Sequence, residues 1–197
     1  MNKKLHIIVL AFNRVMPLRM LIDCFILQSY PYWNMTIVHD GAAPGGVKNI
    51  ITGYTDPRIS FIETEKINGH YGFPNRQMMV ERSDPKQGEF LLFSADDSYY
   101  VPHFIEFMMD EAKDDVGMVY CDMVHSHIRY SLLPGELKVN HIDMGAFITD
   151  IQVAKEVGFQ HINEFAADGM FAEECAAKCH EWGLRTVHVP KPLFIHN

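Results

Sequence analysis

The chain has 197 residues, 48% of them hydrophobic and 21% charged, which is an ordinary composition for one globular domain with a sizeable core. Its formal net charge of −8 argues against a nucleic-acid backbone as partner, and a bound phosphate would need a metal ion or backbone N–H groups because basic side chains are scarce. No apolar run reaches the roughly 18 residues of a membrane span, and the N-terminal run is too short for a signal peptide. We therefore expect a cytoplasmic protein without a transmembrane segment.

Short apolar runs alternate with helical patterns through the first part of the chain. This alternation predicts a largely parallel sheet with right-handed crossovers. We expect strands at 5–12, 35–38, 58–62, 90–93 and 117–121, with helices between them at about 17–26, 43–54, 75–82 and 101–113.

The order loosens after residue 121. Segment 122–138 is expected to form a hairpin or a mobile loop, followed by helices at about 149–157 and 169–182. A last strand is expected at 186–189, after which Pro190 and Pro192 carry the chain to its end.

The four cysteines are not clustered as in a disulfide scaffold. Cys175, Cys179 and His180 suggest a zinc site, but their helical spacing and the lack of a second ligand pair favour a buried helix face. We therefore interpret Cys24, Cys121, Cys175 and Cys179 as structural thiols.

Two adjacent carboxylates end the strand that begins at Phe90. Asp96 and Asp97 follow this apolar run after Ser94 and Ala95, at the strand edge where open α/β sheets bind ligands. Such neighbours repel each other unless a divalent cation, a basic partner or a shared proton relieves the charge. The alternative is structural, with Asp97 or Ser98 capping the next helix.

Other acids also stand at strand ends, namely Asp40 and, further on, Asp143 or Asp168. A metal ion held by Asp97 would bridge a pyrophosphate and offset both the repulsion and the shortage of basic side chains. Three common motifs are absent: the phosphate loop has Val47 where it needs Lys, and neither G-x-G-x-x-G nor G-x-S-x-G occurs.

A series of short segments resembles the family 2 glycosyltransferases of the GT-A fold, with a likeness that extends from about residue 5 to 196. The most specific part is the Asp-Asp-x-x-Tyr-x-Pro sequence that follows a strand. The segments are 7–14 (IIVLAFNR), 27–31 (LQSYP), 39–41 (HDG), 88–90 (GEF), 95–102 (ADDSYYVP) and 167–169 (ADG).

The resemblance implies an α/β chain with the GT-A (nucleotide-diphospho-sugar transferase) fold, in which helices flank a mostly parallel central sheet. Residues 1–197 would form one domain, with the donor nucleotide part at about 1–100 and the acceptor part at about 101–197. It also implies an inverting, hexosyltransferase-like enzyme that uses a nucleotide sugar, for which a UDP-sugar is the favoured donor. The acceptor would be a glycan or another hydroxyl compound.

Donor-binding roles follow from the matching positions. The resemblance implies that Asp40 holds the nucleotide base and that Ala11, Phe12 and Asn13 border it. Asp96 matches the acid near the ribose and the donor sugar.

The same resemblance assigns the metal and the chemistry. Asp97 matches the ligand of the DxD motif for Mn²⁺ or Mg²⁺, and His196 a late histidine that completes the metal site in some relatives. Asp143 lies where the family lines the donor-sugar and acceptor pocket. Asp168 matches the catalytic base that takes the proton of the acceptor hydroxyl.

The chain departs from the family pattern at several positions. Ser94 stands where many members have the first acid of the motif, and Ala167 replaces the acid that usually precedes the base. Glu173 and Glu174 therefore remain rivals of Asp168. The chain also ends earlier than most relatives.

Two alternatives remain open. Ser94 and the early end motivate a non-catalytic member that binds a nucleotide sugar or glycan, although a binding module has no use for a base such as Asp168. A metal-dependent nucleotidyltransferase would need a basic residue near the phosphates, for which Arg14 is the candidate. In segment 122–138, His125, His127 and Tyr130 are candidates for acceptor contacts, with an exposed loop as the alternative.

Overall fold

The computed structural model describes residues 3–83 and 89–197, so Gly88 of the GEF segment lies outside the described residues. The strands are β1 (Leu5–Ala11), β2 (Trp33–His39), β3 (Ile59–Glu63), β4 (Phe90–Ala95), β5 (Ser98–Tyr100), β6 (Val116–His125), β7 (Ser131–Leu133), β8 (Phe147–Asp150) and β9 (Arg185–His196). They form one sheet in the order β3-β2-β1-β4-β8-β6-β9-β5, and β7 pairs with β6.

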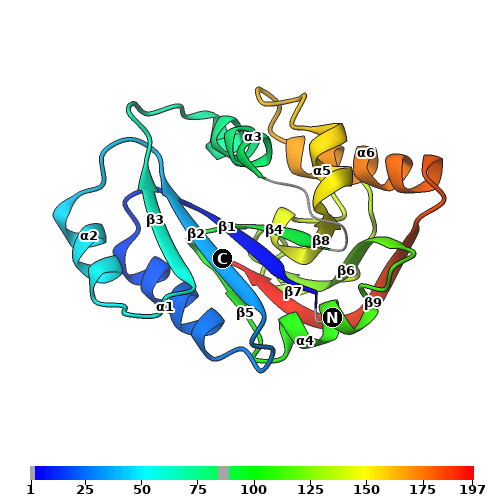
Figure 1. Ribbon diagram of the computed structural model, residues 1–197, viewed down its shortest axis with the longest axis horizontal. Coiled ribbons are helices and arrows are strands. Elements are labelled where there is room, and N and C mark those ends of the chain that lie inside the picture. The colour runs from blue at the N-terminus through cyan, green and yellow to red at the C-terminus, as the bar shows by residue number, and fades with distance from the viewer. Residues whose placement is uncertain (1–2, 84–88) are drawn as a thin grey trace.

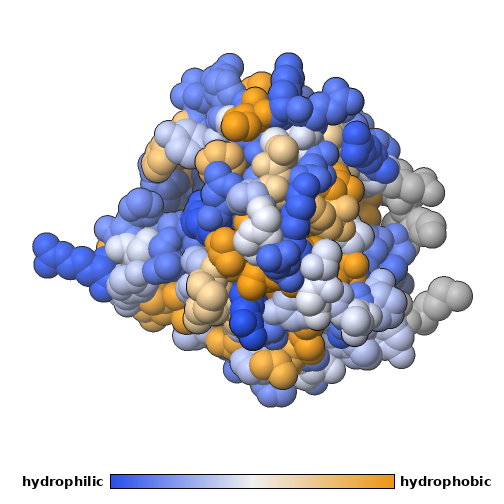
Figure 2. Space-filling view, turned by 90° about the vertical axis from the view of Figure 1, so that its left-hand side faces the viewer, coloured by the Kyte–Doolittle hydropathy of each residue, from blue (hydrophilic) through white to orange (hydrophobic). Residues whose placement is uncertain are grey.

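Helices cover both faces of this sheet. They are α1 (Val15–Ile26), α2 (Gly45–Thr52), α3 (Phe73–Arg82), α4 (Phe104–Glu111), α5 (Ile151–Val157) and α6 (Ala167–Glu181), with 3-10 turns η1 (His70–Gly72), η2 (Ser126–Ile128) and η3 (Met144–Ala146). Helices α3, α5 and α6 lie on one side, and α1 and α4 on the other (Figure 1). The face on the side of α2 is mainly hydrophilic, with small hydrophobic areas between (Figure 2). Among the described helices, none is long and apolar enough to cross a bilayer.

The first half of the sheet is parallel, as the alternation of strands and helices predicts. Strand β1 pairs in parallel with β2 on one side and β4 on the other, and β2 pairs in parallel with β3. The apolar residues of β1 are buried on both faces of the sheet. Helix α1 packs against the sheet with its predicted apolar side, on which Leu18, Leu21 and Phe25 are fully buried. Because Ala11 is paired with His39 and Leu10 with Ala95, three carboxyl ends meet at one edge of the sheet.

The second half differs from the expectation at its last strand. Strand β9 continues from Arg185 through both prolines to His196, well beyond the predicted end at 189. Its parallel pairing with β6 shifts register between Cys121 and Asp122, and this irregularity accommodates residues that lack an N–H donor. The longer strand places His196 opposite His125 of β6 and Ser98 of β5.

The short strand β5 also settles the alternative of a helix cap. Asp96 and Asp97 form the turn between β4 and β5, and Ser98 belongs to β5. Helix α4 begins only at Phe104, and its N-cap residue His103 makes no capping hydrogen bond. The capping interpretation is therefore wrong, and the two acids stand free of any helix end.

The cysteines behave as structural thiols. Cys175 and Cys179 are fully buried on the inner face of α6, whereas His180 is exposed. Burial raises the pKa of the Cys179 thiol to about 12, so it stays protonated and is a poor metal ligand. The zinc alternative at this helix has no support.

Candidate active site

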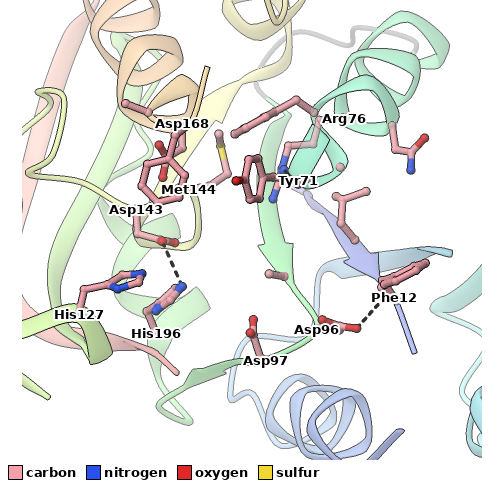
Figure 3. A pocket seen from close by; sticks show the side chains of 18 of the residues that line it. Phe12, Tyr71, Arg76, Asp96, Asp97, His127, Asp143, Met144, Asp168 and His196 are labelled. Atoms are coloured by element: carbon pink, nitrogen blue, oxygen red, sulfur yellow. Dashed lines mark hydrogen bonds and ion pairs between the residues drawn. The ribbon is translucent and has the colours of Figure 1, made fainter. Parts of the chain in front are cut away.

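A cavity of about 830 Å³ opens at the edge where β1 and β4 end. Opposite this edge it is bounded by the start of α6 and by the ends of β6 and β9 (Figure 3). Nearly all the predicted site residues line it: Ala11, Phe12, Asp40, Asp96, Asp97, Asp143, Asp168 and His196. Asn13 is the exception, because its side chain is exposed beside the cavity.

Asp40 lies at the end of β2 and organises the loop that follows β3. Its Oδ1 accepts hydrogen bonds of 2.9 Å from the Asn68 backbone N–H and from Asn75 Nδ2, and its Oδ2 accepts one of 2.9 Å from the Gly69 N–H. Burial raises the pKa of this carboxyl, but the hydrogen bonds outweigh it and the net pKa is lowered. Asp40 is therefore a fixed anion, and Oδ2 has one acceptor position left.

Arg14 lies across the two adjacent acids. Its Nε is 3.0 Å from Asp96 Oδ1, and its Nη1 contacts the Asp97 carboxylate. Of the three ways to relieve the repulsion, the chain itself thus provides the basic partner. Arg14 is about half exposed, so it is free to turn toward a ligand in the cavity.

Asp96 is 1% exposed, and its Oδ2 accepts a 2.8 Å hydrogen bond from the Phe12 backbone N–H. Burial raises the pKa of its carboxyl, against the opposing effects of that hydrogen bond and of Arg14. Although Oδ1 is at ion-pair distance from Arg14, no N–H is aligned with it, so this buried oxygen has no hydrogen bond among the described residues. An unsatisfied buried acceptor in a cavity is available to a ligand hydroxyl.

Ser94 is used elsewhere. It is buried, and its hydroxyl accepts a 3.0 Å hydrogen bond from the Tyr100 hydroxyl. The position where many family members carry an acid is therefore occupied by a core contact, and Ser94 does not line the cavity.

Asp168 and Asp143 face the cavity from its other side, with opposite pKa shifts. Burial and the charge of Asp143 raise the pKa of Asp168 to about 6. Burial also raises the pKa of Asp143, but His125, the charge of His196 and the Gly145 N–H outweigh this effect. The net pKa of Asp143 is lowered, so Asp143 stays ionised. Two neighbouring carboxyls whose pKa values are shifted in opposite directions are typical of sites where one of them acts as a base.

The rival bases lie outside the cavity. Glu173 is exposed and accepts a 2.8 Å hydrogen bond from the Val139 N–H, and Glu174 is 2.8 Å from a ring nitrogen of His161. Neither lines the cavity, so Asp168 is the acid that can reach a bound molecule there.

Arg76 is the residue that the sequence analysis missed. It is 6% exposed; its Nη1 donates a 2.9 Å hydrogen bond to the Tyr71 carbonyl, while Nε has no partner among the described residues. Burial lowers its pKa to about 10, and the charges of Asp168 and Asp143 oppose this shift. A signal was present, because Arg76 shares the buried face of α3 with Phe73 and Val80 at helical spacing.

Three histidines gather beside Asp143. The rings of His125 and His196 stack with centroids 4.2 Å apart, and the ring centroid of His127 is 5.0 Å from that of His125. His196 Nε2 is 3.9 Å from Asp143 Oδ2 (Figure 3). Among the described residues no hydrogen bond or ion pair links His196 to Asp97. Tyr130, the third candidate for acceptor contacts, donates its hydroxyl to Asn197 Oδ1 and does not line the cavity.

The family model described as glycosyl transferase family 2 matches residues 6–139. No curated protein matches the sequence. Among solved structures, S. aureus TarS 1–349 superposes with a TM-score of 0.74 at 13% identity, covering 98% of this chain and 60% of that chain. The mannosyltransferase PcManGT from Pyrobaculum calidifontis, in complex with GDP-Man and Mn²⁺, gives a TM-score of 0.72 at 13% identity, covering 100% of this chain and 57% of its own.

A third structure, S. aureus TarS 1–349 in complex with UDP-GlcNAc, gives a TM-score of 0.73 at 13% identity over 98% of this chain and 58% of that chain. The present chain thus spans about 60% of the length of each of these three structures. At this level of identity the likeness shows the fold, and the predicted GT-A fold is confirmed.

Proposed function

The chain belongs to glycosyl transferase family 2, and from this premise we propose that it is an inverting glycosyltransferase that moves a sugar from a nucleotide-sugar donor to an acceptor hydroxyl. One observation carries the proposal. Asp168, a carboxyl with a pKa raised to about 6, faces the same cavity as the acids at the ends of the parallel strands. Such a group is suited to accept a proton near neutral pH.

The donor nucleotide would lie across the ends of β1, β2 and β4. The free acceptor position on Asp40 Oδ2 suits the ring N–H of a uracil or guanine base, and Ala11 and Phe12 border the same space. The unsatisfied Oδ1 of Asp96 suits a ribose hydroxyl. Related structures hold UDP-GlcNAc and GDP-Man, and both bases carry such an N–H. A UDP-sugar remains our favoured donor.

A divalent cation fits beside Asp97. Mn²⁺ or Mg²⁺ bound together with a diphosphate needs only one or two carboxylates, because phosphate oxygens and water complete its shell. Asp97 provides such a carboxylate once Arg14 turns toward the phosphates. When bound, the cation would offset the charge of the leaving diphosphate. His196 was the second expected ligand, but its contacts are with His125 and Asp143, so we consider it separately below.

In the proposed reaction the acceptor hydroxyl loses its proton to Asp168 as its oxygen bonds to the anomeric carbon. The bond from that carbon to the phosphate oxygen breaks on the opposite face, which inverts the configuration and releases the nucleoside diphosphate. Arg14 is placed to meet the charge that develops on the diphosphate. Arg76 and Asp143 set the charge around Asp168, and the transition state would have oxocarbenium character.

Two substitutions test the proposal in manganese buffer. Asp168→Asn should bind donor nearly as well as wild type, while turnover falls by roughly 10²–10⁴-fold because an amide cannot take the acceptor's proton. Asp97→Ala should lose metal-dependent donor binding and turnover together. Glu173→Gln, an exposed acid on the same helix, is the matched control and should resemble wild type.

The measurements are donor affinity by calorimetry and product formation over a panel of acceptors. Equal turnover in wild type and Asp168→Asn would exclude Asp168 as the base. Donor binding without turnover in wild type, with any acceptor or water, would favour the non-catalytic binding module.

A further inference from the structure

Two distant segments bring three histidines to one wall of the cavity. His125 ends β6, His127 lies in the following turn η2, and His196 ends β9. Pairing of β6 with β9 sets His125 opposite His196. Each of the three side chains offers a ring nitrogen within 4.8 Å of those of the other two. Figure 3 shows two of them, His127 and His196, beside Asp143. The cluster is thus a product of sheet register.

The fold uses only part of the hydrogen-bonding capacity of these rings. Nδ1 of His125 accepts a 3.2 Å hydrogen bond from the His127 N–H, and Nδ1 of His196 is 3.0 Å from the Ser126 hydroxyl. The Nε2 atoms of His125 and His196 lie 3.8 and 3.9 Å from Asp143 Oδ2, which is longer than a hydrogen bond. When Nδ1 of His196 donates to the Ser126 hydroxyl, the lone pair of its Nε2 is available to a further partner. In neutral His125 the ring proton is on Nε2 while Nδ1 accepts the hydrogen bond, so a metal at Nε2 of His125 requires that hydrogen bond to break and the proton to move to Nδ1.

We propose that His125, His127 and His196, with Asp143 as fourth ligand, form a binding site for a divalent transition metal of the zinc and cobalt type. Three imidazoles and one carboxylate are a donor set that such ions favour, whereas Mg²⁺ prefers oxygen ligands. The site is separate from the oxygen-rich position at Asp97, and it rests on the histidine cluster alone, so it does not require the proposed transfer reaction.

Binding would need a small rearrangement. Nitrogens bound at about 2.0–2.1 Å around a tetrahedral ion are roughly 3.3–3.4 Å apart. The cluster must therefore contract from its present spread, and the nearly parallel rings of His125 and His196, which meet at 4°, must rotate to aim at one point. His127 is exposed and lies in a three-residue turn, so its side chain has room to move.

Cobalt titration of the full chain tests the site without reference to activity. We expect one equivalent of Co²⁺ to give the intense visible absorption of a four-coordinate site, to be displaced by Zn²⁺ and to persist in a large excess of Mg²⁺. His127→Ala should weaken Co²⁺ binding roughly tenfold or more, and because His127 is exposed this variant should fold normally. His125→Gln should do the same.

Two matched variants separate this site from others. His103→Ala removes an exposed histidine at the start of α4, outside the cavity, and should leave the Co²⁺ spectrum and affinity unchanged. Asp97→Ala should also keep the absorption band. The proposal is overturned if wild type shows no such band, if His127→Ala and His125→Gln both bind Co²⁺ as wild type does, or if Asp97→Ala abolishes binding.

Discussion

Transfer should lose its general base as the pH falls through about 6, the value to which the cavity raises the pKa of Asp168. The base works only when deprotonated, so activity is present above this pKa and disappears below it. For a single titrating group, about nine-tenths is deprotonated one unit above the pKa and about one-tenth one unit below, so kcat/KM should drop roughly tenfold from pH 7 to pH 5. A carboxyl at its ordinary value of 3.8 would keep nearly full activity over this range.

The cause of the shift can be tested in the same assay. Asp143→Asn removes the neighbouring negative charge that raises the pKa of Asp168, so the acid limb of the profile should move to lower pH. Conversely, Arg76→Met removes a positive charge that lowers this pKa, and the limb should move to higher pH. The position of the limb is diagnostic even where a variant reduces the absolute rate.

The assay is kcat/KM for transfer as a function of pH, which reports groups in the free enzyme, with circular dichroism to check folding at each pH. Glu173→Gln serves as control, because this exposed acid lies outside the cavity, and its profile should match wild type. A limb near pH 4 in wild type, or limbs that coincide in wild type, Asp143→Asn and Arg76→Met, would refute the reasoning.

Two further outcomes follow from the same carboxylates. Asp168 has a folded pKa of about 6 against an ordinary 3.8, so its ionised form destabilises the fold at neutral pH by at most about 3 kcal/mol. Asp168→Asn should therefore increase the free energy of unfolding at pH 7.5, but not below pH 3.8, as measured by urea denaturation. Asp40→Ala should weaken binding of nucleoside diphosphate even without metal, because it removes the proposed hydrogen-bond acceptor for the nucleotide base and the acceptor of the Asn68 N–H. Wild-type affinity of this variant in calorimetry would exclude a role of Asp40 in binding the nucleotide base.

Local patterns were sufficient for the first half of the fold. Strand β1 has an uninterrupted apolar run because both of its faces are buried, and α1 shows its buried side at helical spacing. The acids at 40, 96 and 97 were predicted to share an edge because the carboxyl ends of parallel strands meet there. These inferences depend on a few neighbouring residues each, and the structure confirms the placement.

Long-range pairing was beyond the sequence. Strand β5 has three residues and exists because β9 pairs with it, and β9 was expected to stop before Pro190. Only the register of β6 on β9 shows that His196 meets His125, residues that are far apart in the chain. The sequence likewise left open whether a divalent cation, a basic side chain or a shared proton offsets the charge of Asp97. The structure places the basic side chain of Arg14 against it.

The charge of the cavity connects these observations. Among the described residues, the lining contains five carboxylates and two guanidinium groups, which together carry a net charge of −3 when all are ionised. They are Asp40, Asp96, Asp97, Asp143 and Asp168 against Arg14 and Arg76. A nucleoside diphosphate is itself an anion, and it would be repelled by this wall unless positive charge enters with it. The Nε and Nη1 atoms of Arg14 contact Asp96 and Asp97, so a phosphate that drew Arg14 away from them would restore the repulsion between those two acids. Donor binding should therefore be linked to uptake of a cation, in agreement with the role that we propose for Asp97.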